Sequence, residues 1–151
     1  MDNIGDSYNF RNISDHLTTS GSVTREQLAS LKSQGYEVLI NLLPHDNKHA
    51  LPEEPELVES QQIEYIRIPV DWNAPTEENY AAFVAAIQNT QQRKTHIHCA
   101  ANWRVSAFYS IYASGQGIWD QKTARAHIEN MWNPNDFPVW KQFLANHGLN
   151  F

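Results

Sequence analysis

The chain has 151 residues, with 17 acidic and 11 basic side chains and a formal net charge of −6 at pH 7. Hydrophobic residues make up 41% and charged residues 19%, which is typical of one globular domain with a sizeable core. The acidic balance argues against a nucleic-acid or anionic-membrane partner, because either would need a basic face. The single cysteine excludes an internal disulfide framework and a multi-cysteine metal site.

No apolar run approaches the roughly 20 residues that a transmembrane helix needs. The first seven residues are polar and lack the apolar region of a signal peptide. We therefore expect a cytoplasmic protein without a membrane span, although removal of a signal peptide would leave the same pattern. We further expect a flexible N-terminus over residues 1–9 and one domain over residues 10–151. The sequence does not fix the oligomeric state.

Strands and helices alternate along the chain. Residues 10–17 predict an edge strand, which leads into a loop of small residues over 18–24. Further strands are expected at 38–43, 63–70 and 95–99, and helices at 24–34, 53–62, 76–93, 104–114, 120–131 and 139–147. Thr24, Thr76 and Asp120 are the expected N-caps. This order predicts a single α/β domain with a central, mostly parallel sheet covered by helices on both faces.

The stretch from Thr95 to Phe108 reads as a strand, a loop that starts at Cys99 and ends at Arg104, and a helix. The first amides of a helix have no internal partner, and the helix dipole adds positive charge there. Such amides can hold an oxyanion and favour the thiolate form of a cysteine. The planar guanidinium of Arg104 can hold two phosphate oxygens. The expected phosphate-binding residues are Ala100, Ala101, Asn102, Trp103 and Arg104.

His98-Cys99, four further residues, Arg104 and an apolar helix resemble the signature loop of the cysteine-dependent protein tyrosine and dual-specificity phosphatases. Their loop usually has five residues between Cys and Arg. The shorter loop is similar to that of the bacterial DUF442 phosphatase-like family, also found fused to beta-lactamase-like hydrolases, with patterns such as Cys-Ala-Ser-Gly-Asn-Arg-Val. Cys99, Ala100, Arg104 and Val105 match that pattern. The resemblance extends over most of the chain and implies a dual-specificity-phosphatase-like fold.

The loop departs from the family at three positions. Asn102 stands where the family tends to have Gly, although Asn tolerates left-handed backbone angles better than most residues. Trp103 is bulkier than the usual residue and is expected to narrow the pocket mouth. Val105 stands where the larger phosphatases often have Ser or Thr, with Ser106 one step later. The change removes a hydroxyl that would stabilise the thiolate as a leaving group.

Asp71 follows a strand end, and parallel sheets gather ligand sites at the carboxyl ends of their strands. The resemblance implies that Asp71 protonates the leaving alcohol and later helps water to attack the phosphocysteine. The alternative is a turn residue whose side chain bonds to backbone amides. Trp72, His45 and His98 are candidates for the pocket rim, and His98 is also expected to orient the loop by hydrogen bonds.

Other readings of these residues stay open. Cys99 could be a buried structural thiol, and Arg104 could pair with a carboxylate at the edge of the sheet. His96 and His98 share a strand face, but no third ligand is evident nearby, so we expect no metal and no cofactor. Core packing is the expected role of Trp119, Trp132 and Trp140.

The resemblance implies an enzyme that hydrolyses phosphate monoesters through a phosphocysteine intermediate. Its partner would be a phosphorylated small molecule or a phosphoprotein, with phosphate or sulfate held in the loop. One alternative is a rhodanese-like sulfurtransferase, whose six-residue loop also starts with Cys at a strand end. A second is a catalytically weak phosphate-binding or partner-binding module of the same fold. The sequence does not name the substrate.

Overall fold

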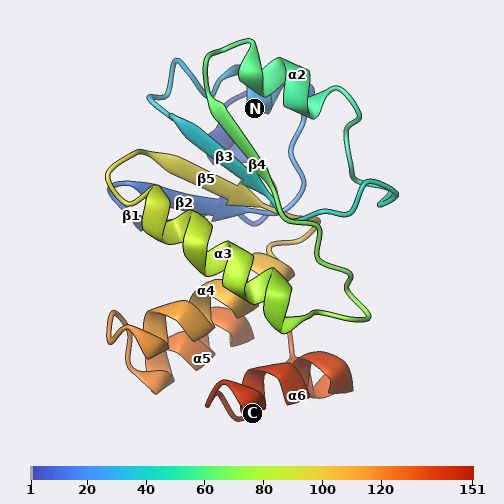
Figure 1. Cartoon of the computed structure of the whole chain (residues 1–151), viewed down its shortest axis with the longest axis vertical. Helices are drawn as coiled ribbons and strands as arrows, with labels where there is room; N and C mark the ends of the chain where they lie inside the picture. Colours follow the sequence, from blue (N-terminus) through green and yellow to red (C-terminus); the bar gives the residue numbers. More distant parts are fainter. Residues whose placement is uncertain (1) are drawn as a thin grey trace.

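The computed structural model describes residues 2–151, and Met1 lies outside the described part. The described elements are, in chain order, η1 (Ile4–Asp6), β1 (Arg11–Ser14), β2 (Leu17–Ser20), α1 (Arg25–Ala29), β3 (Val38–Asn41), α2 (Glu54–Glu59), β4 (Glu64–Arg67), α3 (Glu77–Asn89), β5 (Thr95–His98), α4 (Trp103–Gly115), α5 (Gln121–Glu129), η2 (Pro134–Asp136) and α6 (Pro138–Asn146). Figure 1 shows the sheet above and the last helices below it.

The five strands form one sheet in the order β1-β2-β5-β3-β4. Strand β1 is antiparallel to β2, and every other neighbouring pair is parallel. Strands β3 and β5 are buried along their whole length, as expected for central parallel strands that are covered on both faces. The predicted α/β architecture is confirmed.

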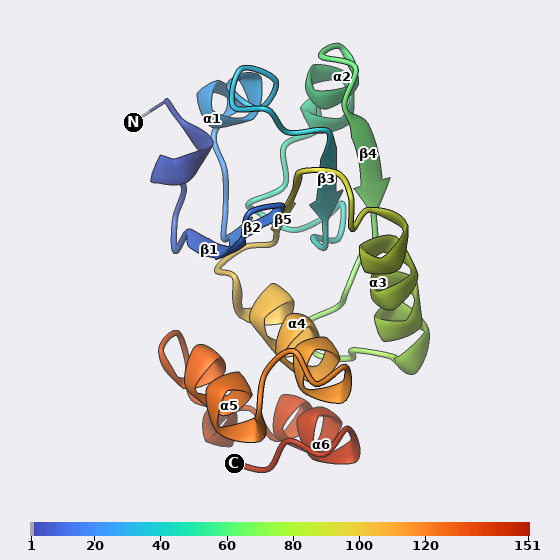
Figure 2. The same ribbon diagram turned by 90° about the vertical axis from the view of Figure 1, so that its left-hand side faces the viewer.

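Helices cover the sheet on two sides, as Figure 2 shows. Helices α1 and α2 lie on one side and pack around Leu28, Leu31 and Val58 in a smaller apolar cluster. Helix α3 and helix α4 lie on the other side, where the larger core forms. Residues 104–113 of α4 are all buried, because α5 and α6 cover the side of α4 that faces away from the sheet. The sequence predicts this central position from the apolar residues around α4.

Three predicted helix caps are confirmed by side-chain hydrogen bonds. Thr24 accepts from the amide of Gln27, and Thr76 does so from the amide of Asn79. Asp120 accepts from the amide of Thr123. Each cap satisfies an amide that would have no partner at the start of a helix.

The predicted loop over 18–24 is wrong in its first part, because β2 runs from Leu17 to Ser20 and pairs with both β1 and β5. Small polar residues read as loop when only hydrophobicity is considered. Here Thr18, Thr19 and Ser20 are buried, and their hydroxyls form tertiary hydrogen bonds with His96 and Asn102. The flexible N-terminus over residues 1–9 stays a prediction. The structure packs Ile4, which is 1% exposed, into the smaller apolar cluster.

Candidate active site

The candidate nucleophile loop connects β5 to α4 at the carboxyl edge of the sheet. Cys99 directly follows β5, and its amide bonds to the carbonyl of Ser20 at the end of β2. Asn102 is the N-cap of α4 and has a left-handed backbone, with φ 69°. The chain therefore turns sharply into a helix, and the start of α4 points its amides toward the loop.

Six successive amides, those of residues 100–105, donate to no acceptor within residues 2–151. The carbonyls of Ala100 and Ala101 are engaged elsewhere. They accept from the amide of Ser22 at 2.7 Å and from Nδ2 of Asn9 at 3.0 Å. Unpaired amides of this kind, at the positive end of a 13-residue helix, form a site that favours an anion.

The side chain of Asn102 ties the loop to neighbouring segments of the chain. Its side chain is fully buried, and Nδ2 donates to the carbonyl of Asn9 and to Oγ1 of Thr19, each at 3.0 Å. Asn therefore does more here than Gly could, because it adopts the left-handed angle and also ties the loop to β2 and the N-terminal segment. Its Oδ1 is buried without a hydrogen-bond partner among the described residues.

Gly21 allows the loop to lie close to the end of β2. A Cβ atom at Gly21 would lie 2.7 Å from the carbonyl oxygen of Ala100 and 2.8 Å from Cα of Ala101. Real Cβ atoms do not approach backbone atoms this closely, so the loop position depends on the missing side chain. The sequence interpretation overlooked Asn9, Thr19 and Gly21 as supports. The run Thr19-Ser20-Gly21, shortly before the helix capped by Thr24, is the sequence feature that indicates such a support.

Arg104 is 7% exposed and anchored at one end. Its Nε donates to the carbonyl of Val70 at 2.8 Å, and its guanidinium lies 5.5 Å from the ring centre of Trp72. No carboxylate of residues 2–151 forms an ion pair with it, so the alternative reading as an edge ion pair is not what the structure shows. Its two terminal nitrogens have no acceptor within the described chain and remain free to donate.

Cys99 has no exposed surface and counts among the core residues. It lies at the base of the loop whose amides are unpaired. The loop amides and the terminal nitrogens of Arg104 are unpaired donors that suit an anion, whereas Cys99 has no surface open to solvent. Cys99 is therefore both a buried thiol and the first residue of a loop whose amides suit an anion.

Asp71 is exposed and follows Val70, the residue that binds Arg104. Its Oδ1 accepts from the amide of Asn73 at 2.9 Å, and its carbonyl accepts from the amide of Ala74 at 3.1 Å. This is the turn that the alternative reading describes. The hydrogen bond from Arg104 to Val70 nevertheless ties the Asp71 segment to the nucleophile loop.

Four of the five tryptophans gather beside this segment. The ring of Trp72 lies 5.8 Å from that of Trp103, 5.3 Å from Trp132 and 4.9 Å from Trp140. Trp140 also donates to the carbonyl of Trp72 at 2.7 Å. Trp132 and Trp140 are buried, as predicted. The cluster holds the Asp71 segment in place, and Trp72 and Trp103 pack mainly on other rings.

His98 lies beneath α2 and not at an exposed rim. Its Nε2 is 2.6 Å from Oε2 of Glu54, both side chains are 1% exposed, and its Nδ1 is 3.3 Å from the carbonyl of Cys99. Glu54 had no distinguishing feature in the sequence beyond its place in a short acidic helix. Of the other rim candidates, His45 is exposed in the loop after β3.

His96 is fully buried between two hydroxyls. Its Nδ1 is 2.7 Å from Oγ1 of Thr18, and its Nε2 is 2.8 Å from Oγ of Ser20. Ser20 donates its own proton to the carbonyl of Gly21, so Nε2 carries the proton and donates to Ser20. Burial, and then the nearby charge of His98, hold the pKa of His96 well below its ordinary value. Neither ring nitrogen is free for a metal.

The chain is similar in sequence and structure to known phosphatase-like proteins. Residues 5–136 match the family described as DSP-PTPase phosphatase fused to NAD+ kinase. The DUF442 protein of Shewanella putrefaciens is similar over 99% of both chains, with 32% identity and a TM-score of 0.87. No curated protein matches the chain.

More distant structures show the same fold. The core catalytic domain of the PP-IP phosphatase SIW14 from S. cerevisiae, in complex with citrate, has 13% identity and a TM-score of 0.76, over 92% of this chain and 85% of that one. A cysteine-to-serine form of TpbA from P. aeruginosa, in complex with pTyr, has 12% identity and a TM-score of 0.73, over 93% and 85%.

The fold and the loop define a phosphatase-like α/β protein related to the cysteine-dependent tyrosine and dual-specificity phosphatases. The chain belongs to the family of DSP-PTPase phosphatases fused to NAD+ kinase, and the DUF442 phosphatase-like protein is among its structural relatives. The predicted family and fold are confirmed. No helix within residues 2–151 combines the length and the apolar character needed to cross a membrane.

Proposed function

We propose that the protein hydrolyses phosphate monoesters through a phosphocysteine intermediate at Cys99. The observation that carries this proposal is the run of six unpaired amides over residues 100–105, next to the free end of the Arg104 guanidinium. These donors suit the three outer oxygens of a phosphoryl group, on which negative charge is spread during transfer.

In this mechanism the Cys99 thiolate attacks phosphorus in line with the leaving oxygen. The loop amides and Arg104 hold the outer oxygens, and Asp71 gives a proton to the leaving alcohol. Water then attacks the phosphocysteine and releases phosphate. Asp71 must leave its hydrogen bond with Asn73 or use its other oxygen for this step. Residues 100–104 form the phosphate seat, and Trp72 and His45 lie on the segments that would face the ester.

A second candidate function rests on the burial of Cys99, which is fully inaccessible in this structure. A module that binds phosphate, or a phosphorylated partner, needs the amides and Arg104 but no access to the thiol. Val105 in place of a hydroxyl residue and the bulky Trp103 favour the same reading. A sulfurtransferase has less support, because it would also need an accessible thiol and makes no use of Asp71.

The substrate class would be a phosphorylated small molecule or a phosphoprotein. The relatives bound to citrate and to pTyr support an anion in the loop. No resident metal or cofactor enters the proposed reaction. The proposed location is the cytoplasm.

The test compares turnover of a small aryl phosphate with binding of inorganic phosphate by calorimetry. For the phosphatase, the wild-type chain turns over, vanadate inhibits and EDTA does not. Cys99→Ser should then abolish turnover and leave phosphate binding nearly unchanged, whereas Arg104→Lys should weaken both, because Lys cannot hold two oxygens with one planar group.

Phosphate binding by the wild-type chain without hydrolysis of any ester would select the binding module. Turnover that survives Cys99→Ser would refute the phosphocysteine mechanism. Transfer of sulfur from thiosulfate to cyanide would select the sulfurtransferase instead.

A further inference from the structure

A cavity lies at the edge of the sheet opposite the nucleophile loop. Its volume is about 230 Å³, and it is bordered by the starts of β2 and β5, the end of α3, and the second half of α4 with the turn that follows it. The loop follows the carboxyl end of β5, whereas Thr95 of this cavity is the first residue of β5. The two sites therefore lie at opposite edges of the sheet.

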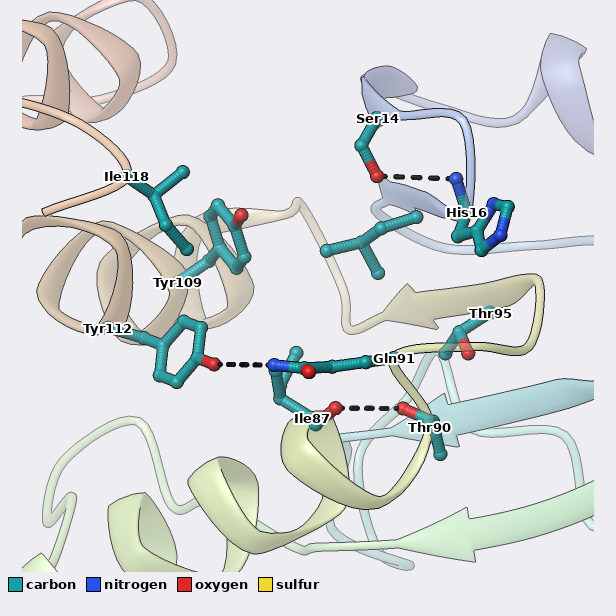
Figure 3. Close-up of a pocket in the computed structure, with 10 residues that line it drawn as sticks. Ser14, His16, Ile87, Thr90, Gln91, Thr95, Tyr109, Tyr112 and Ile118 are labelled. Carbon is teal, nitrogen blue, oxygen red and sulfur yellow. Dashed lines mark hydrogen bonds between the residues drawn. The ribbon is translucent and has the colours of Figure 1, made fainter. Parts of the chain in front are cut away.

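The cavity walls are apolar with a few polar groups at fixed places. Leu17, Ile87 and Ile118 supply aliphatic surface, and Tyr109 and Tyr112 of α4 supply aromatic surface. Figure 3 shows Tyr109, Tyr112 and Ile118 on one side of the cavity, opposite His16 and Thr95. Ile118 is 54% exposed and adds aliphatic surface at the border of the cavity.

The polar groups at the cavity differ in whether they already have a hydrogen-bond partner within the protein. Thr90 and Thr95 donate to the carbonyls of Ala86 and Arg93. The hydroxyl of Tyr112 accepts from Nε2 of Gln91 at 3.2 Å, as the dashed line in Figure 3 shows. Each of these groups has a hydrogen-bond partner within the protein, although Tyr112 is only an acceptor and keeps its own proton.

Tyr109 is the exception. The residue is only 5% exposed, yet its hydroxyl has no hydrogen-bond partner within residues 2–151. Its ring is fixed by an edge contact with Trp119 at 5.1 Å. Burial raises the pKa of Tyr109, so the phenol stays neutral and can donate. The oxygen is not among the buried unpartnered atoms of the described chain, so it is open to solvent, and an acceptor on a ligand can take the place of water as its partner.

No Lys, Arg, Asp or Glu lines the cavity, and His16 is exposed at its border. A charged ligand would lose its hydration here without gaining a partner of opposite charge. A volume of about 230 Å³ is also below the roughly 300–1,000 Å³ that is usual for sites of drug-sized molecules. The chemistry thus selects a ligand of fragment size that is uncharged.

We propose that this cavity is a second ligand site, for a small uncharged aromatic molecule whose acceptor oxygen takes the hydroxyl proton of Tyr109. The ring of the ligand would lie between the aliphatic side chains and the two tyrosines, and its oxygen would face Tyr109. The proposal is independent of catalysis at Cys99, since no residue of the cavity belongs to the candidate active site.

The test uses three probes of similar size on the full chain, followed by amide chemical shifts in NMR titrations. Acetophenone has the ring and an acceptor oxygen, toluene has the ring alone, and benzoate carries a charge. Acetophenone should give saturable shifts at the amides of the cavity residues. Toluene should bind roughly fivefold more weakly, as expected for the loss of one neutral hydrogen bond, and benzoate should give no saturable shifts there.

Tyr109→Phe keeps the ring and removes the hydroxyl, so it should weaken acetophenone binding roughly fivefold and leave toluene binding unchanged. Tyr8→Phe is the matched control, because Tyr8 is 60% exposed and does not line the cavity; it should change neither affinity. Equal binding of acetophenone and toluene, unchanged acetophenone binding in Tyr109→Phe, or the absence of saturable shifts at the cavity would each overturn the proposal.

Discussion

The side chains of Asn9 and Asn102 tie the N-terminal segment to the candidate phosphate loop, 93 positions further along the chain. Nδ2 of Asn102 donates to the carbonyl of Asn9, and Nδ2 of Asn9 donates to the carbonyl of Ala101. Both asparagines have left-handed backbones, with φ 56° at Asn9 and 69° at Asn102. The N-terminal segment and the candidate phosphate loop are thereby fixed as one unit.

Substitution of Asn102 separates its two contributions. Asn102→Gly keeps the left-handed angle but loses two hydrogen bonds, so we expect the free energy of unfolding to fall by about 1–3 kcal/mol. Asn102→Ala loses the same bonds and adds roughly 1 kcal/mol of backbone strain. Urea unfolding of both variants measures this order. Equal stability of the Gly and Ala variants would show that the backbone angle is not a constraint.

Gly21 sets how closely the loop can approach β2. Gly21→Ala would place its methyl group against the backbone of residues 100 and 101, and overpacking of this kind costs about 1–3 kcal/mol. Because the loop must shift, phosphate affinity should also fall several-fold. Gly115→Ala is the matched control, since no atom lies within 4 Å of its added Cβ. It should keep phosphate affinity, which calorimetry can measure for both variants.

The buried pair of His98 and Glu54 should contribute far more to stability than an exposed pair. Glu54→Ala leaves His98 without its partner in a site that water does not reach, which should cost roughly 3–5 kcal/mol. Glu64→Ala removes the exposed pair with Arg93, at 2.8 Å, and should cost less than about 1 kcal/mol. Denaturant unfolding gives both values. A cost below about 1 kcal/mol for Glu54→Ala would mean that the pair is not a structural support.

The nucleophile loop and Arg104 could be predicted from the order of neighbouring residues in the sequence. A buried strand, one cysteine, an arginine five positions later and an apolar helix place Cys99 and Arg104 at the carboxyl edge of any parallel sheet. The same holds for the caps, because Thr24, Thr76 and Asp120 act on amides only three residues away. Such features depend on neighbours in the sequence.

The supports of the loop could not be predicted in this way. The burial of Thr18 and Thr19 depends on His96 and Asn102, which lie 78 and 83 positions away. Glu54 looks like an ordinary acidic residue at a helix start until His98 is brought against it by the pairing of β3 with β5. The burial of Cys99 likewise follows from packing that no local pattern describes.

Acid should destabilise the protein through His127 in a defined pH window. Burial, and then the charge of Arg11, lower the pKa of His127 to about 4 from its ordinary value of 6.5. Between these values the unfolded chain binds a proton at His127 and the folded chain does not. The free energy of unfolding therefore falls as the pH drops from about 6.5 to 4, by on the order of 3 kcal/mol. His96, whose pKa is also lowered, acts in the same direction.

His127→Phe isolates this contribution because it keeps a ring against Trp119, whose centre lies 4.9 Å away, and cannot be protonated. It also removes Nε2, which is buried without a hydrogen-bond partner among the described residues, so we expect stability at pH 7 to be equal or higher. Unfolding measured at several pH values should show a shallower loss in His127→Phe than in the wild-type chain. His49→Phe, at an exposed position, should keep the wild-type slope. Identical slopes for all three chains would contradict the lowered pKa of His127 and leave His96 to account for the acid sensitivity.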